Sequence, residues 1–345
     1  MDNITYLLGA GASANCIPVV KAMGQEIENT AQRFLGTCFR YNNFPDSSEK
    51  ENHNNKVLEI QKDLLWLAKI CKTHYSVDTY AKKLYIKEEN EELLKLKKIL
   101  SIYFTIQQKL TLPDKRYDNF WASILDYKDS FPKQLRIISW NYDSQLELSY
   151  RNFISSSVSM EEAYGRIRMA SFHGNERATD FDGFAIFKLN GSARMLKKRE
   201  GRNYASYLVD NFTFEDNTDF FEKLYQSYRA LQYDPMKTKD ESFHSELSFA
   251  WEHNFDFEYY KNLKASIADT TVLVVIGYSF PFFNRKLDKL IINDYMPNLR
   301  KVYFQAPDAE NLQERFLAIT NKISVKEMVL TKDENQFTFP NELDI

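Results

Sequence analysis

Glycine and proline are scarce in this chain, which has 10 and 9 of them among 345 residues. Because both residues interrupt helices and strands, their scarcity favours long packed helices over a loop-rich scaffold. Cysteine is rarer still, and the three copies, Cys16, Cys38 and Cys71, are spaced for neither a disulfide framework nor a zinc site. We therefore expect a reducing, cytoplasmic compartment and no bound metal.

Long apolar runs and an excess of positive charge are also missing. The strongest apolar run, residues 272–276 with its flanks, is far shorter than the ~20 residues that span a bilayer. Residues 1–10 lack the basic region of a signal peptide. A formal net charge of −3 gives no general attraction to nucleic acid or to an anionic membrane, so we expect neither as a direct partner.

Apolar residues are plentiful, at 43% of the chain, which is enough for a sizeable buried core. Short apolar runs with the length of buried strands lie at 4–8, 135–140, 184–189, 271–276 and 301–305. Helical patterns occur between several of them. Strands that alternate with helices predict an α/β protein with a Rossmann-like parallel sheet and helices on both faces.

The rest of the chain divides around these strands. The predicted sheet domain is assembled from three stretches, 1–20, 135–200 and 265–345. Residues 21–134 form a helical insertion domain, because leucines recur there at helical spacing among lysines and glutamates. Within it, residues 42–56 are polar without an apolar period, which predicts a loop. Residues 201–264 are rich in aromatic side chains and are predicted to be an aromatic-rich helical segment.

The clearest local motif follows the first strand, where Gly9 and Gly11 flank Ala10 and Ser13 follows. A glycine turn between a strand and a helix lets backbone N–H groups approach a pyrophosphate, and the helix N-terminus adds a favourable dipole. The hydroxyl of Ser13 could donate a further hydrogen bond. A tight structural turn is the alternative interpretation of so short a motif.

Two more polar or glycine-containing segments follow strand ends. Asn141 and Asp143 come after the strand at 135–140, and Gly277 comes after the strand at 271–276. In open parallel sheets, ligands bind at the carboxyl ends of the strands, which points to a shared nucleotide site. Asn and Asp at such positions are also ordinary turn formers and helix caps, and that alternative stays open here.

Together, these motifs resemble the sirtuin-like family of NAD-consuming proteins, and more its bacterial antiphage-defence branch than its protein deacylases. The segments that carry the resemblance occur in the family's order: Leu8-Gly9-Ala10-Gly11-Ala12-Ser13 with Ile17-Pro18, Trp140-Asn141-Tyr142-Asp143, Lys188-Leu189-Asn190-Gly191-Ser192, and Val275-Ile276-Gly277-Tyr278-Ser279-Phe280. The resemblance covers about residues 1–20, 135–195 and 265–310. The Cys-rich zinc module of the deacylases has no counterpart in this sequence.

The resemblance implies an NAD hydrolase that releases nicotinamide and ADP-ribose, with NAD as substrate and no metal. It further implies an effector that depletes NAD in defence against phage. Because an NAD-consuming enzyme that is permanently active would harm its own cell, we expect gating by a ligand, by self-assembly into a homo-oligomer or by a partner protein encoded nearby. Asn141 would contact the nicotinamide ribose or the attacking water, and Asp143 would shape that pocket. The residues that would contact NAD are Gly9, Ala10, Gly11, Ser13, Ile17, Pro18, Tyr142, Gly191, Gly277, Tyr278 and Ser279.

One departure from the family's pattern concerns catalysis. The family has a histidine in the motif that here reads Lys-Leu-Asn-Gly, so Asn190 stands where an imidazole acts on the ribose hydroxyls. An amide cannot accept a proton as an imidazole can. His173, in the sequence Phe-His-Gly-Asn, could supply the imidazole from a neighbouring loop.

Three other functions remain open beside NAD hydrolysis. The first is a catalytically silent sensor that binds NAD or ADP-ribose, which Asn190 favours. The second is an oxidoreductase, disfavoured because no acidic residue ends a second strand about twenty residues after the glycines. The third is an interaction subunit with a vestigial cleft.

Overall fold

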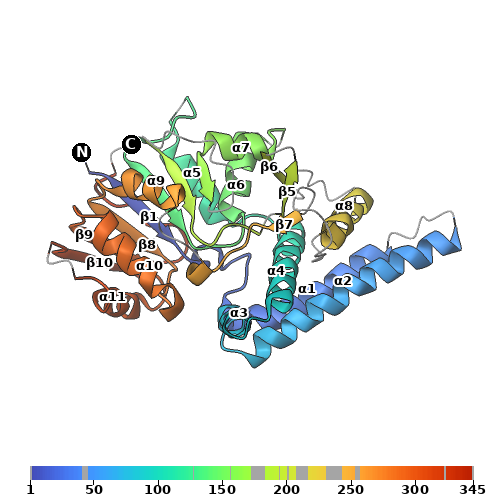
Figure 1. The fold of residues 1–345 in the computed structure, drawn as a ribbon. Coiled ribbons are helices and arrows are strands. Elements are labelled where there is room, and N and C mark those ends of the chain that lie inside the picture. Colours follow the sequence, from blue (N-terminus) through green and yellow to red (C-terminus); the bar gives the residue numbers. More distant parts are fainter. Residues whose placement is uncertain are drawn as a thin grey trace. The chain divides into compact units, whose positions relative to one another are not determined.

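The computed structural model describes residues 2–40, 46–126, 128–155, 157–171, 183–193, 195–199, 202–206, 217–230, 243–252, 257–321 and 324–343 (Figure 1). The chain divides into two compact units. The sheet unit contains Met1–Cys16, Pro113–Ser192 and Ser248–Ile345, and the helical unit contains Ile17–Leu112 and Ala193–Leu247. These bounds differ from the expected ones chiefly at residues 113–134 and 248–264, which belong with the sheet.

The sheet unit is built on seven parallel strands in the order β10-β9-β8-β1-β2-β4-β3 (Figure 1). The strands are β1 (Ile4–Leu8), β2 (Leu135–Ser139), β3 (Met169–Ser171), β4 (Ala185–Lys188), β8 (Val272–Ile276), β9 (Lys301–Gln305) and β10 (Glu327–Thr331). The predicted α/β fold with a parallel sheet is confirmed. Two strands were not predicted from the sequence: β3 has only three residues, and β10 has an apolar run of only three, Met328 to Leu330, with side chains that are partly buried or exposed.

The strand order places a topological switch in the middle of the sheet. From β1 the chain proceeds to β2 on one side, and it later crosses back to β8 on the other side of β1 and continues to β9 and β10. Leu8 lies opposite both Ser139 and Ile276, and Ser139 lies opposite Lys188. The carboxyl ends of β1, β2, β4 and β8 are therefore level with one another along one edge, where open α/β sheets bind ligands.

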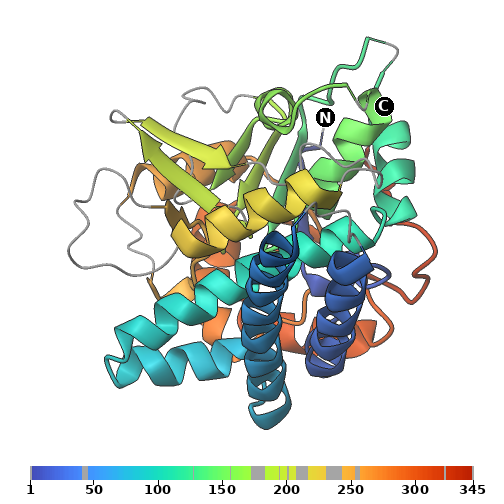
Figure 2. The same ribbon diagram turned by 90° about the vertical axis from the view of Figure 1, so that its right-hand side faces the viewer.

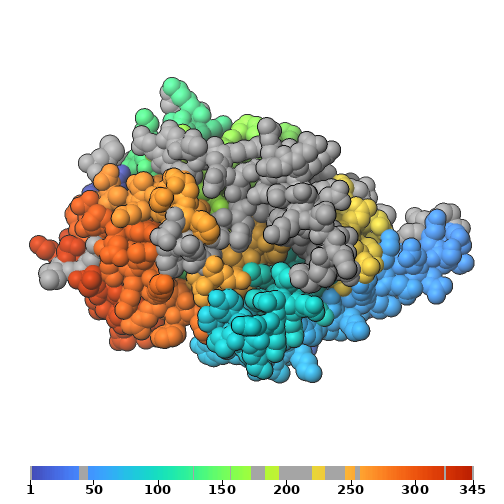
Figure 3. Space-filling view, viewed as in Figure 1, coloured from blue at the N-terminus to red at the C-terminus, as the bar shows by residue number. Residues whose placement is uncertain are grey.

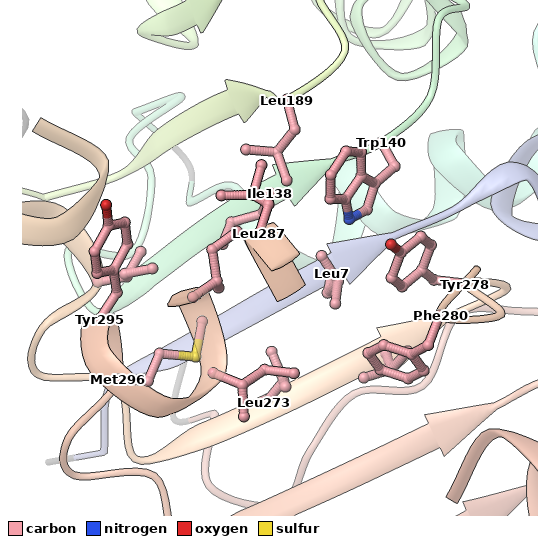
Figure 4. Close-up of a cluster of buried hydrophobic side chains, with 14 of the residues drawn as sticks. Leu7, Ile138, Trp140, Leu189, Leu273, Tyr278, Phe280, Leu287, Tyr295 and Met296 are labelled. Atoms are coloured by element: carbon pink, nitrogen blue, oxygen red, sulfur yellow. The ribbon is translucent and has the colours of Figure 1, made fainter. Parts of the chain in front are cut away.

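Helices cover both faces of the sheet. Alternate residues of a strand point to opposite faces, so Leu7 and Tyr6 of β1 show what packs on each. Leu7 of β1 belongs to a large apolar cluster with residues of α9 (Glu258–Ile267), α10 (Arg285–Lys289) and α11 (Ala309–Leu317) (Figure 4). In the space-filling view, the orange side chains of this part of the chain form a continuous piece of the surface of the sheet unit (Figure 3). The neighbouring Tyr6 packs edge-on against Phe120 of α5 (Lys115–Ile124), with ring centres 5.2 Å apart.

Two more helices follow β2 in the sheet unit, α6 (Gln145–Ile154) and α7 (Met160–Arg166). Short turns of 3-10 helix occupy Ala10–Ser13, Ala250–Glu252 and Phe282–Asn284, and a π-helix follows α10 at Leu290–Tyr295. The first of these turns starts directly after Gly9, where the sequence analysis expected the glycine turn.

The helical unit contains α1 (Val20–Arg40), α2 (Ser47–Thr73), α3 (Val77–Ile86), α4 (Asn90–Leu110) and α8 (Asn217–Ala230). In the second view, α1 and α2 run side by side (Figure 2). The loop predicted at residues 42–56 is wrong from Ser47 onward, because α2 begins there. The carboxylate of Asp46 accepts a hydrogen bond from the Ser48 backbone and caps this helix end, which outweighs the missing apolar period.

The helical unit also contains a three-stranded antiparallel sheet in the order β6-β5-β7. Its strands are β5 (Met195–Arg199), β6 (Arg202–Ser206) and β7 (Phe243–Ser245). The aromatic-rich segment at 201–264 is therefore not wholly helical as predicted, since aromatic side chains suit strands as well as helices. Within the described part of the chain, no helix combines the length and the apolar character that a membrane span requires.

Candidate functional site

Four of the segments singled out in the sequence meet at the carboxyl edge of the sheet. Gly9 follows β1, Asn141 follows β2, Asn190 follows β4 and Gly277 follows β8, and these four strands are direct neighbours. Segments separated by more than a hundred residues in sequence therefore share one edge. This convergence is what a ligand site at the carboxyl ends of parallel strands requires.

The glycines of this edge are packed against one another. A Cβ atom placed on Gly11 would lie 2.6 Å from the Cα atom of Gly277, and one on Gly9 would lie 2.5 Å from the Cα atom of Tyr278. Gly277 also has a φ of +59°, in the left-handed region that favours glycine. Glycine is thus demanded here by the close approach of the turns after β1 and β8. A Gly11→Asp variant would disturb this packing, so it could not test ligand binding with the fold intact.

The backbone N–H groups of the glycine turn are largely engaged within the chain. Gly9 donates to the carbonyl of Ile276, and Gly11 donates to that of Gly277, each at 3.0 Å. Ala12 donates to the carbonyl of Gly9 at 2.9 Å. Ala10 is exposed at the start of the 3-10 turn. The N–H groups of Gly9 and Gly11 are therefore not free to bind a pyrophosphate in the way that the sequence suggests. These two glycines would instead contribute by leaving room for the ligand beside the turn.

A buried arginine holds the other side of the same turn. The Arg116 guanidinium donates to the carbonyls of Gly11 at 3.2 Å and Ala12 at 3.0 Å, and it forms an ion pair with Asp114 at 2.6 Å. A third contact reaches the carbonyl of Glu334 at 3.4 Å. Arg116 thereby fixes the turn from the carbonyl side and links it to the segment after β10.

Ser13, at the end of the glycine turn, connects it to the segment after β2. Its hydroxyl donates to the carboxylate of Asp143 at 3.1 Å, and it accepts a longer contact from the side-chain amide of Asn141 at 3.4 Å. The hydroxyl of Tyr117 lies 3.0 Å from the same oxygen, and it acts as donor because the single Ser13 proton points to Asp143. The predicted residues Ser13, Asn141 and Asp143 thus form one buried network, to which α5 adds Tyr117.

Asp143 lies in an environment that disfavours its charge. Burial, the largest effect, raises the pKa of its carboxyl above the ordinary value. The positive charge of Lys188 and hydrogen bonds from the Gln145 backbone and from Ser13 oppose that shift without cancelling it. Asp143 therefore takes up a proton at a higher pH than an exposed aspartate does.

Asn190 is buried at the end of β4, with 5% of its surface exposed. Its side-chain nitrogen donates to the carbonyl of Trp140 at 3.3 Å, and its backbone carbonyl accepts a hydrogen bond from Ser248 at 3.0 Å. Its side-chain oxygen has no hydrogen-bond partner in the described part of the chain. A buried acceptor without a partner is costly, so this oxygen is a candidate contact for a ligand hydroxyl or amide.

A second buried carboxyl lies behind the edge, beneath Tyr278. The Tyr278 ring stacks on Trp140 with ring centres 5.7 Å apart, and the two lie side by side in the close-up (Figure 4). The Tyr278 hydroxyl donates to Asp288 at 2.9 Å and accepts from Asn284 at 3.1 Å. Burial raises the pKa of Asp288 well above its ordinary value. This arrangement places Tyr278 inside the apolar cluster as a support for the edge, with its hydroxyl occupied.

The remaining predicted residues have varied positions. Tyr142 is half-buried, with its ring edge-on to Phe249 at 6.3 Å, and Ser279 is exposed. Gly191 has a φ of +68°, a conformation suited to glycine. Two predicted contacts, Ile17 and Pro18, belong to the helical unit, and His173 lies outside the described residues.

Several residues that hold this edge in place were not predicted from the sequence. Arg116, Tyr117 and Asp288 lie on α5 and α10, far in sequence from the motifs they support. Lys188 was quoted only as part of a motif, and Glu147, on the first turn of α6, was not considered as its partner. A charged residue inside an apolar pattern was the available signal, and it does not identify the partner.

The described residues contain no group of three or more His, Cys, Asp or Glu side chains arranged to hold a metal ion. Comparison of the chain with protein-family models and with curated proteins gives no match.

Proposed function

We propose that this chain binds NAD at the carboxyl edge of its sheet and hydrolyses the bond between nicotinamide and ribose, releasing nicotinamide and ADP-ribose. The observation that carries the proposal is the convergence of four motifs on the adjacent ends of β1, β2, β4 and β8. Each motif by itself is an ordinary turn. Their meeting at one edge, in the order of the sirtuin-like family that they resemble, favours a common ligand.

The chemistry needs a site that steadies positive charge and positions water. Cleavage of a glycosidic bond develops an oxocarbenium-like ribose carbon, which a nearby carboxylate stabilises. Asp143 would supply that charge, and the amide of Asn141 would orient the attacking water or the ribose. Burial raises the pKa of Asp143, so its carboxylate becomes protonated at a higher pH than an exposed aspartate does. As the pH is lowered, activity that needs the charged form should therefore be lost earlier, at a higher pH.

The absence of an imidazole at Asn190 favours a second candidate, a silent sensor that binds NAD or ADP-ribose without cleaving it. The unpartnered oxygen of Asn190 can accept a hydrogen bond from a ribose hydroxyl, but an amide does not titrate near neutral pH. In the hydrolase, water would then attack without a strong base at this position, or His173 would supply one. Binding without nicotinamide release would favour the sensor.

The first experiment incubates the purified chain with NAD and measures nicotinamide release, with NAD binding followed by calorimetry. Asn141→Ala should lower kcat by about a hundredfold, the loss typical of one positioning donor. Its stability should change little, because its side-chain contact with Ser13 is long, at 3.4 Å. Asn298→Ala is the matched control, since Asn298 is exposed and, among the described residues, its side chain bonds to the carbonyl of Ala268 alone. Full activity of Asn141→Ala would remove Asn141 from the mechanism.

A second set of variants locates the base. If His173 supplies the imidazole, His173→Ala should silence cleavage while Asn190→Ala leaves much of it; if Asn190 orients the ribose, the order reverses. Asn190→His restores the residue of the family's motif and should raise the rate of a slow enzyme. Each variant needs a thermal melt to verify folding. If NAD binds but none of the three variants alters nicotinamide release, the sensor becomes the better assignment.

The biological role follows from the same resemblance. An enzyme that consumes NAD without restraint would harm its own cell, so we propose an effector in antiphage defence, gated by a ligand, by self-assembly or by a partner protein. The cytoplasm supplies NAD and keeps thiols reduced, as suits three free cysteines. A dilute monomer with full activity in the absence of any activator would contradict the gating.

A further inference from the structure

Three consecutive residues at the end of β4 donate hydrogen bonds to three carbonyls of the segment 139–143. The Leu189 backbone donates to Ser139 at 2.9 Å, and the Asn190 side chain donates to Trp140 at 3.3 Å. The Lys188 ammonium donates to the carbonyl of Asp143 at 2.5 Å. The first two contacts hold the segment before Asn141, and only the lysine among the three holds it beyond Asn141.

Lys188 makes this contact while almost fully buried. Its side chain is 2% exposed, and its ammonium lies 3.0 Å from a carboxylate oxygen of Glu147, whose side chain is 0% exposed. Neither Glu147 oxygen makes a directed hydrogen bond among the described residues, so this pairing is one of charge. Glu147 lies in the first turn of α6, where the helix dipole also favours a negative charge.

Burying an ion pair in a protein core costs free energy. Apolar side chains of similar volume often stabilise a core equally well, because two charges must lose their hydration. A buried pair is therefore weak evidence for a role in stability alone. The ammonium of Lys188 does something that an apolar side chain cannot, since it bonds the carbonyl of Asp143 at the end of the segment that carries Asn141 and Asp143.

We propose that Lys188 is a positioning residue that holds Asn141 and Asp143 in register with Asn190, and that Glu147 serves as its counter-charge. Lys188 and Asn190 leave the same strand end, so one rigid element sets both halves of the site. The proposal rests on the proposed function for its catalytic consequence, whereas the positioning itself is a property of the chain without ligand.

The first arm of the test needs no ligand. The backbone amides of Asn141 and Gln145 donate to the side-chain oxygens of Ser139 and Asp143, which both belong to the segment, so the hydrogen exchange of these amides reports its order. In Lys188→Met/Glu147→Met, which removes both charges of the ion pair, these amides should exchange at least about tenfold faster while those of β1 and β8 stay protected. In Glu147→Gln, the lysine keeps its bond to the Asp143 carbonyl, and protection should largely remain.

The second arm follows nicotinamide release. The double variant should lose at least about tenfold in kcat with KM changed by less than about threefold, since misplaced catalytic groups cost more in the transition state than in binding. Lys301→Met is the matched control. Lys301 also forms an ion pair, with Glu342 at 2.9 Å, but it is the first residue of β9 and so lies at the end of that strand away from the carboxyl edge. It should change neither exchange at Asn141 nor kcat.

The outcomes are separable. Unchanged exchange at Asn141 and Gln145 in the folded double variant would overturn the positioning role, whatever the enzyme does. Faster exchange with unchanged kcat would also overturn it, because the segment would then be held for no catalytic purpose. If the wild-type chain neither binds nor cleaves NAD, the proposed function fails, and the exchange arm alone decides whether Lys188 orders the segment.

Discussion

The contact between the turns after β1 and β8 gives a quantitative prediction for Gly277→Ala. The new methyl group would lie 2.5 Å from the carbonyl carbon of Gly11 and 2.7 Å from the backbone nitrogen of Ala12. Both are backbone atoms, so no side chain can rotate away. Left-handed backbone costs a non-glycine residue about 1–2 kcal/mol, and overpacking adds about 1–3 kcal/mol. The variant should therefore lose roughly 2–5 kcal/mol of unfolding free energy.

The assay is urea-induced unfolding followed by circular dichroism, with Gly165→Ala as the control. Gly165 lies in α7 of the same unit, has nothing within 4 Å of an added Cβ atom and has no positive φ. Alanine there should stabilise the protein by up to about 1 kcal/mol through helix propensity. A loss of less than about 1 kcal/mol in Gly277→Ala relative to this control would refute the close packing of the two turns.

Two more predictions concern buried charges. Arg116→Met should cost about 3–5 kcal/mol, because it leaves Asp114 buried without its partner and frees two carbonyls of the glycine turn. Asp114→Asn/Arg116→Met should cost clearly less, and equal losses in urea unfolding would contradict the ion-pair argument. In the helical unit, burial lowers the pKa of Lys98 from 10.5 to about 8, so the unfolded chain binds more protons between these values. Stability should rise with pH from about 8 to 10.5, and Lys98→Met should remove that rise; an unchanged pH dependence of the urea midpoint would refute it.

The fold was predictable where the physical signal was local. Residues 272–276 are apolar throughout, and residues 4–8 are apolar except for Thr5, because β1 and β8 are buried on both faces, and such runs identify central parallel strands. The edge strand β10 was not predicted because none of its side chains is fully buried and its apolar run is short. The start of α2 escaped because a capping aspartate, rather than an apolar period, sets it.

The candidate site was predictable only in its outline. Each motif could be placed after a strand, and parallel strands present their carboxyl ends at one edge, so Gly9, Asn141 and Gly277 were expected near one another. The reason for the glycines was not visible in sequence. Gly11 and Gly277 are required by their mutual contact, since a close approach of two turns depends on strand order.

The sequence by itself determined the central strands of the parallel sheet and the segments that end them, because strand burial and turn chemistry act over a few neighbouring residues. Only the tertiary structure decided which charges are paired at the edge. Lys188 and Glu147 are 41 residues apart, with Nζ and Oε1 at 3.0 Å, and Arg116 reaches the glycine turn from 104 residues away. Which charges pair depends on how the strands and helices are arranged in space. Burial makes the pairing necessary, since a charge removed from water needs an opposite charge within a few ångströms.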